Sequence, residues 1–163
     1  LAAMVNDVLR SGSVAEQALR QEKRLRIDKL IAEVVDDYTL LAKTRGMTFM
    51  VNTEPTTIRI NRDMMRHVIS NLVSNAVRHG DAGSVITITC NQHELAIENA
   101  CKPLTKQQLQ HVFDPFYRSS DSTKQHADSS GIGLYTVKML LDAKGLNYEF
   151  MPVGRGMRFI VKL

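Results

Sequence analysis

The chain has 163 residues, of which 44% are hydrophobic and 23% charged, a composition typical of one soluble globular domain. Its net charge of +4 is mildly basic, but no lysine and arginine block and no basic patch interleaved with aromatic residues indicates nucleic-acid binding. No run of about 18 apolar residues exists, which argues against a membrane-spanning helix. Cys90 and Cys101 lie outside any CxxC pair, so a zinc site is not expected and reduced thiols are favoured over a disulfide.

Apolar residues recur with helical and strand periods in turn. In chain order the predicted elements are a helix over 1–24, a helix over 28–45, strands over 48–52 and 56–61, a long helix that starts at Asn61 or Asp63 and ends at His79, strands over 84–91 and 93–98, a short helix over 105–112, a helix over 131–143, and strands over 147–152 and 157–163. Asp28 is the predicted cap of the second helix, and residues 16–26 are polar enough for a solvated helix face or a linker. Residues 119–130 lack periodicity, which predicts a mobile loop. The sum predicts an α+β fold, a two-layer α/β sandwich whose mixed, mostly antiparallel sheet is covered on one face by helices.

Asn71 and Asn75 share one face of the long helix, because residues four apart lie one turn apart. Arg78 and His79 follow one turn later. Two amide oxygens and a guanidinium on one face suit a hydrated Mg²⁺ with phosphates, since Mg²⁺ prefers oxygen ligands and arginine matches phosphate geometry. Asparagines on helices more often face solvent, and the apolar residues that flank both positions favour the binding role.

Three further segments offer contacts to a ligand. Residues 129–134 place two glycines at the start of a helix, where backbone N–H groups can approach an anion, although a tight turn explains them equally well. Residues 113–118 form a hydrophobic anchor at the base of the predicted loop, from which Arg118 could reach a phosphate. Residues 154–159 are an ordinary hairpin turn between two strands when considered alone.

In this order and spacing, the four segments resemble the boxes of the ATP-binding domain of bacterial sensor histidine kinases. This domain belongs to the superfamily shared with gyrase, MutL and the ninety-kilodalton heat-shock chaperone. Residues 71–79 resemble the asparagine box, 113–118 the phenylalanine box, 131–134 the second glycine box and 154–156 the last glycine turn. The resemblance covers about residues 28–163. It implies a layered α/β sandwich that binds ATP and Mg²⁺ between the asparagine-box helix and a flexible ATP lid, residues 119–130.

The resemblance also implies roles for single residues. Asn75 would bind Mg²⁺, Asn71 would be a nearby polar contact, and His79 would lie against the nucleotide. Arg78 would meet phosphate and Arg118 would orient the γ-phosphate, so that Asn71, Arg78 and Arg118 serve phosphoryl transfer. The implied nucleotide site consists of Asn71, Asn75, Arg78, His79, Asn99, Leu104, Phe116, Tyr117, Arg118, Gly131, Ile132, Gly133, Leu134 and Gly156.

The sequence departs from the family pattern in three places. Asn99 stands where the first glycine box has the Asp that accepts the adenine amino proton, and both glycines of that box are replaced within residues 99–103. An Asn carbonyl can still accept this bond but lacks charge assistance, and a similar Asn occurs in the vancomycin-resistance branch of these kinases. Met157 replaces a Thr of the last turn, and Ser129-Ser130 replace glycines of the lid. The first two changes affect the adenine end, which predicts weak ATP affinity with intact phosphate chemistry.

The phosphoacceptor His of the family usually lies in a His-Glu-Leu-x-x-Pro helix, and none of the five histidines has this context. Residues 1–10 resemble the end of the second dimerisation helix, so residues 1–24 are expected to be the remnant of that helix with a linker and 25–163 the catalytic domain. The resemblance implies a protein-histidine kinase that acts on its own dimerisation domain and signals to a response regulator. The parent protein would be a membrane-anchored homodimer with this domain in the cytoplasm, and no nucleic-acid partner is expected.

Three alternatives stay open. A degenerate domain that senses nucleotide without turnover is compatible with the lost glycines. Another superfamily member, such as an ATPase clamp or an anti-sigma kinase, is disfavoured by the phenylalanine box and the helix remnant. A purely structural interaction module predicts no nucleotide binding at all.

Overall fold

The computed structural model describes residues 20–118 and 131–163. The elements, in chain order, are β1 (Lys23–Arg26), α2 (Ile27–Thr44), β2 (Thr48–Thr53), β3 (Thr57–Ile60), α3 (Arg62–His79), β4 (Val85–Cys90), β5 (Glu94–Ala100), α4 (Lys106–His111), α5 (Gly133–Lys144), β6 (Tyr148–Val153) and β7 (Gly156–Lys162). The predicted lid, most of the predicted first helix and the Ser129-Ser130 pair lie outside the described residues.

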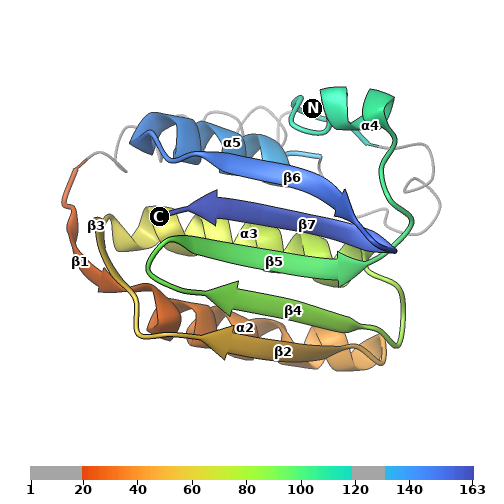
Figure 1. Cartoon of the computed structure of the whole chain (residues 1–163), viewed down its shortest axis with the longest axis horizontal. Coiled ribbons are helices and arrows are strands. Elements are labelled where there is room, and N and C mark those ends of the chain that lie inside the picture. The colour runs from red at the N-terminus through yellow and green to blue at the C-terminus, as the bar shows by residue number, and fades with distance from the viewer. Residues whose placement is uncertain (1–19, 119–130) are drawn as a thin grey trace, which may run out of the picture.

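Five strands form one layer of the fold, in the order β2-β4-β5-β7-β6. β2 and β4 run parallel, whereas the other neighbours in this sheet run antiparallel. Figure 1 shows α2, α3 and α5 together behind the sheet, on one of its two faces. This arrangement confirms the predicted two-layer α+β sandwich with a mixed, mostly antiparallel sheet.

The core lies between this sheet and the helices. In β4, Ile86, Ile88 and Cys90 are buried, as the predicted alternation requires. The helix α3 contributes the largest set of buried side chains, which are Met64, Met65, Val68, Ile69, Leu72, Val73, Ala76 and Val77. Each fully buried aliphatic side chain contributes about 1.5–3 kcal/mol to folding, so this helix is held firmly against the sheet. Both cysteines are free thiols.

Both ends of α3 are fixed by local chemistry. At its start, Asn61 Oδ1 accepts a hydrogen bond from the Met64 N–H at 3.0 Å, which caps the helix. Gly80 follows the last helical residue, and a Cβ there would lie 2.5 Å from Met47 Cε and 2.6 Å from the Ala76 carbonyl oxygen. Only glycine therefore allows the chain to leave the helix along this path, and the predicted helix is confirmed.

Two predictions near the N-terminus are wrong. Residues 23–26 form β1, which pairs antiparallel with β3 in a separate two-stranded sheet, instead of a solvated helix face or a linker. The predicted division into residues 1–24 and 25–163 stays a prediction. Asp28 does not cap α2; its carboxylate binds the Arg26 guanidinium and accepts the Thr56 N–H at 3.1 Å. Among the described residues, no helix is long and apolar enough to cross a membrane.

Candidate functional site

Asn71 faces the start of α5 across the helical layer. Its Nδ2 donates to the His67 carbonyl oxygen at 2.9 Å, one turn earlier in α3. A Cβ on Gly133, the first residue of α5, would lie 3.2 Å from Asn71 Oδ1. The first N–H groups of a helix have no partner within the helix and carry the positive end of its dipole. An amide oxygen and a helix N-terminus therefore meet here, a combination that suits Mg²⁺ and phosphate oxygens.

Three further residues of the asparagine box occupy the last two turns of α3. Asn75 and Arg78 are half-buried, and His79 is exposed. Nε of Arg78 donates to Ser74 Oγ at 3.2 Å. This bond uses one of the five N–H groups of the guanidinium and leaves the other four for further partners. The helical spacing places Asn71 and Asn75 one turn apart, as predicted.

Phe116 and Gly131 lie against each other, although fourteen residues separate them in the sequence. The Phe116 N–H donates to the Gly131 carbonyl oxygen at 3.0 Å. Both residues have left-handed backbone, with φ of 64° at Phe116 and 70° at Gly131. A Cβ on Gly131 would lie 2.9 Å from the Phe116 carbonyl carbon, so glycine is required there. Tyr117 and Arg118, which follow Phe116, are half-buried.

Phe113 anchors this segment in an aromatic cluster. Its ring lies edge-on to Tyr148, Phe150 and Phe159, with centroid distances of 5.6, 6.5 and 6.2 Å. Edge-to-face pairs of this kind are each worth about 0.5–1.5 kcal/mol beyond the buried area. The predicted hydrophobic anchor is confirmed.

Two residues of the second glycine box have side chains that serve packing. Ile132 is buried and Leu134 packs against the core, so only their backbone groups could contact a nucleotide.

Asn99, Gly156 and Met157 meet where β5 and β7 pair. Asn99 is only 8% exposed and stands opposite Met157 in the strand register. A Cβ on Gly156 would overlap the Asn99 carbonyl oxygen, so the two backbones approach too closely for any other residue. The Leu104 N–H donates to Met157 Sδ at 3.4 Å, which gives the methionine a polar contact at this end. Burial raises the pKa of the adjoining Cys101 thiol, which stays protonated at neutral pH.

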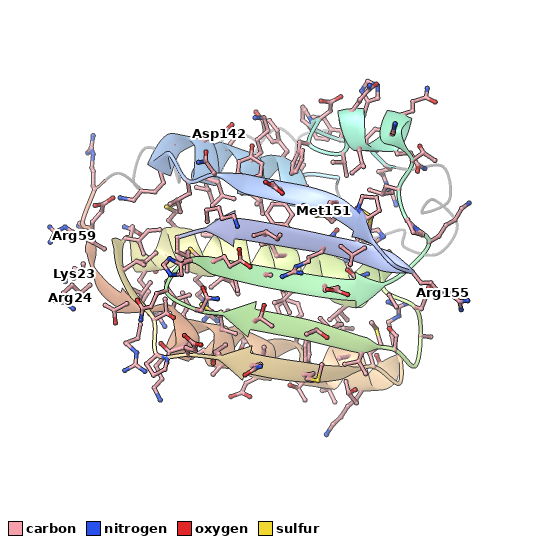
Figure 2. The ribbon with its side chains drawn as sticks, viewed as in Figure 1. Lys23, Arg24, Arg59, Asp142, Met151 and Arg155 are labelled. Carbon is pink, nitrogen blue, oxygen red and sulfur yellow. The ribbon has the colours of Figure 1, made fainter. Side chains whose placement is uncertain are left out.

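The side chains available to a metal ion favour Mg²⁺ bound through few protein oxygens. Within residues 20–118 and 131–163, no group of three or more His, Cys, Asp or Glu could hold a metal ion. Mg²⁺ commonly keeps several waters and takes few protein oxygens together with substrate phosphates, so an amide such as Asn75 beside phosphates fits this ion. Figure 2 shows Lys23, Arg24 and Arg59 at the opposite end of the molecule from Arg155 in the β6–β7 turn, so these three cations do not serve the site.

Sequence reasoning did not identify Arg45, which binds the end of α3. Its guanidinium donates to the carbonyl oxygens of Val77, Arg78 and Gly80. These contacts join residues 32 to 35 positions apart, so no local pattern in the sequence reveals them.

Comparison with known proteins agrees with this geometry. Residues 60–163 match the family of histidine kinase-, DNA gyrase B-, and HSP90-like ATPases. Sensor histidine protein kinase HK06 of Streptococcus pneumoniae is 32% identical over 161 residues, which cover 98% of this chain and 36% of that protein. Sensor histidine kinase CusS of Escherichia coli is 30% identical over 168 residues, which cover 100% of this chain and 35% of that protein. The chain thus spans about a third of the length of these curated relatives.

Solved structures share the fold. The catalytic domain of histidine kinase ThkA superposes with a TM-score of 0.75 at 19% identity, over 88% of this chain and 96% of that one. Acinetobacter baumannii histidine kinase AdeS superposes with a TM-score of 0.78 at 21% identity, over 99% of this chain and 77% of that one. Membership of the vancomycin-resistance branch stays a prediction. The chain belongs to the histidine kinase-, DNA gyrase B- and HSP90-like ATPase family, as the catalytic ATPase domain of a sensor histidine kinase.

Proposed function

We propose that this domain binds ATP together with Mg²⁺ and transfers the γ-phosphoryl group to a histidine on the dimerisation domain of its parent protein. The observation that carries the proposal is the approach of Asn71 Oδ1 to Gly133 at the N-terminus of α5, in a chain of this ATPase family. It supports a phosphate site between the end of α3, which carries the asparagine box, and the start of α5, which carries the second glycine box.

The assigned residues act by positioning and by charge. Asn75 holds Mg²⁺, Asn71 orients the groups around it, and Arg78 and Arg118 neutralise phosphate oxygens. Mg²⁺, when bound, supplies further positive charge for the phosphate oxygens. N–H groups at the start of α5 bind phosphate without needing a side chain. His79, Asn99, Leu104 and Tyr117 line the remainder of the nucleotide, and Asn99 Oδ1 accepts the adenine amino proton.

The partners follow from the reaction. The acceptor imidazole comes from the dimerisation domain of the same protein, and its nitrogen forms a bond to the γ-phosphorus as ADP leaves. Histidine kinase ThkA has been solved in complex with the response regulator protein TrrA. By analogy we propose a response regulator as the next acceptor, and a homodimeric, membrane-anchored parent protein with this domain in the cytoplasm.

Phosphoryl transfer in trans tests this proposal. The chain would be incubated with Mg²⁺ and γ-labelled ATP and with the dimerisation domain of its parent protein, and label on the histidine would be followed. Transfer that stops in Asn75→Ala is the expected result, with Asn52→Ala on the exposed strand β2 as the control. An intact, nucleotide-binding chain that never labels the acceptor would contradict it.

The second candidate is a nucleotide sensor without turnover. It is favoured by the adenine end, where Met157 Sδ receives the Leu104 N–H and Cys101 and Pro103 replace the two family glycines. This candidate predicts nucleotide binding without transfer to the acceptor, so the same experiment separates the two.

A further inference from the structure

Arg45 binds the end of α3 with its side chain. Its Nη1 donates to the carbonyl oxygens of Val77 and Arg78, the latter at 2.9 Å, and its Nη2 donates to that of Gly80 at 2.9 Å. The last four carbonyl groups of an α-helix have no partner within the helix. One half-buried guanidinium therefore binds the end of the helical turn that carries Arg78 and His79.

The main chain of Arg45 also binds the segment that follows Gly80. Its carbonyl oxygen accepts the Gly83 N–H at 2.9 Å. Between these points, the Asp81 N–H donates to the carbonyl oxygen of Ala100 at 2.8 Å, at the end of β5 next to Asn99. The connection after α3, residues 80–83, thus joins the phosphate end of the proposed site to its adenine end. Arg45 forms hydrogen bonds with both the first and the last residue of this connection.

The charge of Arg45 matters as well as its hydrogen bonds. A helix C-terminus carries about half a negative elementary charge on its free carbonyl groups. This charge opposes the binding of phosphate oxygens beside Arg78, in the last turn of α3. A guanidinium bound to these carbonyl groups offsets the opposing charge, which a neutral side chain or water would not do.

We propose that Arg45 is a positioning residue of the nucleotide site, which fixes the last turn of α3 and offsets its negative charge so that the phosphates bind more tightly. This inference rests on the proposed function, because that function places phosphate oxygens beside Arg78, near the end of α3. It goes beyond that function, since Arg45 is the residue that follows α2 and acts on the site only through α3.

The test compares charged and neutral ligands. Affinities for a non-hydrolysable ATP analogue with Mg²⁺ and for adenosine would be measured by calorimetry and NMR, for the native chain, Arg45→Lys and Arg45→Met. Arg66→Met is the matched control, because it removes the same charge from the opposite half of α3, where Arg66 pairs with Glu33 and Asp37. Thermal unfolding of each variant reports whether it is folded.

The expected loss in Arg45→Met is about tenfold for the ATP analogue, equivalent to about 1.4 kcal/mol, and smaller for adenosine. Arg45→Lys keeps the charge without the planar fork and should fall between the native chain and Arg45→Met. Arg66→Met should bind the analogue as the native chain does.

Two results would overturn the inference. A folded Arg45→Met that binds the analogue with native affinity removes any role in binding, and an equal loss in Arg66→Met shows that the effect is not specific to the helix end. If Arg45→Met does not fold, Arg45→Lys decides: weakened analogue binding supports the inference and native binding overturns it. Failure of the native chain to bind the analogue would instead contradict the proposed function.

Discussion

Asn71 lies so close to Gly133 that a Cβ at position 133 would be 3.2 Å from Asn71 Oδ1, and the amide would have to shift by a few tenths of an ångström to admit it. This relationship connects the asparagine box with the second glycine box, which lie on different helices. Since Asn71 Nδ2 is held by the His67 carbonyl oxygen, the amide cannot turn away without losing that hydrogen bond. The close approach therefore has a consequence for ligand binding that substitutions can measure.

Replacement of Gly133 by alanine should weaken nucleotide binding more than it changes stability. Alanine in a helix is favoured over glycine by about 1 kcal/mol, which offsets part of the strain from the tight contact. The methyl group displaces the Asn71 amide and fills space next to the proposed phosphates, so we expect an affinity loss of about fivefold or more, given that tenfold corresponds to about 1.4 kcal/mol. Calorimetry and urea unfolding measure the two effects.

The double variant Asn71→Ala, Gly133→Ala is the control for this mechanism. If the methyl group acts by displacing Asn71, the double variant should bind nucleotide no more weakly than Asn71→Ala alone. A further loss of affinity in the double variant would show that the methyl group excludes the ligand directly.

Asn99→Asp should strengthen nucleotide binding. A carboxylate accepts the adenine amino proton with charge assistance, which makes such a bond roughly twice as strong as the neutral one. The substitution gives up the 3.4 Å contact from Asn99 Nδ2 to the Ala100 carbonyl oxygen. We expect an increase in affinity of about threefold to tenfold, within the 1.4 kcal/mol that a factor of ten represents.

Asn52→Asp on the exposed strand β2 makes the same change of charge away from the site and should leave the affinity unchanged. Unchanged or weaker binding in Asn99→Asp would mean that Asn99 does not receive the adenine amino group.

The sequence predicts α3 well because each local signal agrees. Asn61 is a good N-cap, the apolar stripe has a helical period, and Gly80 follows the last turn. The strand β1 could not be predicted in this way, since residues 23–26 contain a single apolar side chain, Leu25. They form a strand because they pair with β3, which places Leu25 opposite Ile58 beside the core.

The candidate site shows the same division between local and long-range information. Helical spacing places Asn71 and Asn75 one turn apart, but nothing in the sequence pattern says that Gly133 lies next to Asn71; only the family resemblance implied it. The sequence predicts Asp28 as a cap, because Asp is common before a helix. Its carboxylate instead accepts the Thr56 N–H, 28 residues away, an interaction that only the folded chain reveals.

Gly156→Ala should destabilise the domain by about 2–3 kcal/mol, the upper part of the range for overpacking a well-packed site. The added Cβ would overlap the carbonyl oxygen of Asn99, which is backbone and is held in the β5–β7 ladder. Gly154→Ala is the control: a Cβ there meets no neighbour, and only its left-handed backbone, with φ of 55°, adds a cost of about 1 kcal/mol. Equal losses of unfolding free energy in the two variants would contradict this account.

Asp28 should make the stability of the domain depend on acid pH. The Arg26 guanidinium and the Thr56 N–H hold the pKa of its carboxyl well below the ordinary value of about 3.9. The folded state therefore binds fewer protons than the unfolded state, so this stabilisation is complete above about pH 5 and is lost as the pH falls through the folded-state pKa.

Asp28→Asn measures this contribution. Urea unfolding between pH 7 and pH 3 should show the variant less stable by about 1–2 kcal/mol at pH 7, with the difference shrinking below about pH 4. Asp37→Asn, which removes an exposed ion pair with Arg66, should change stability by less than about 1 kcal/mol. A pH-independent difference for Asp28→Asn would contradict the assignment of the effect to its charge.

The central claim is that α3 and the start of α5 bind the phosphates of ATP together with Mg²⁺. The most direct measurement is a calorimetric titration of the chain with a non-hydrolysable ATP analogue, with and without Mg²⁺, in the native chain and in Asn75→Ala. The account predicts binding that requires Mg²⁺ and is lost in Asn75→Ala, with Asn52→Ala binding as the native chain does. No binding by the native chain at millimolar ligand, or Mg²⁺-dependent binding that survives in Asn75→Ala, would contradict it.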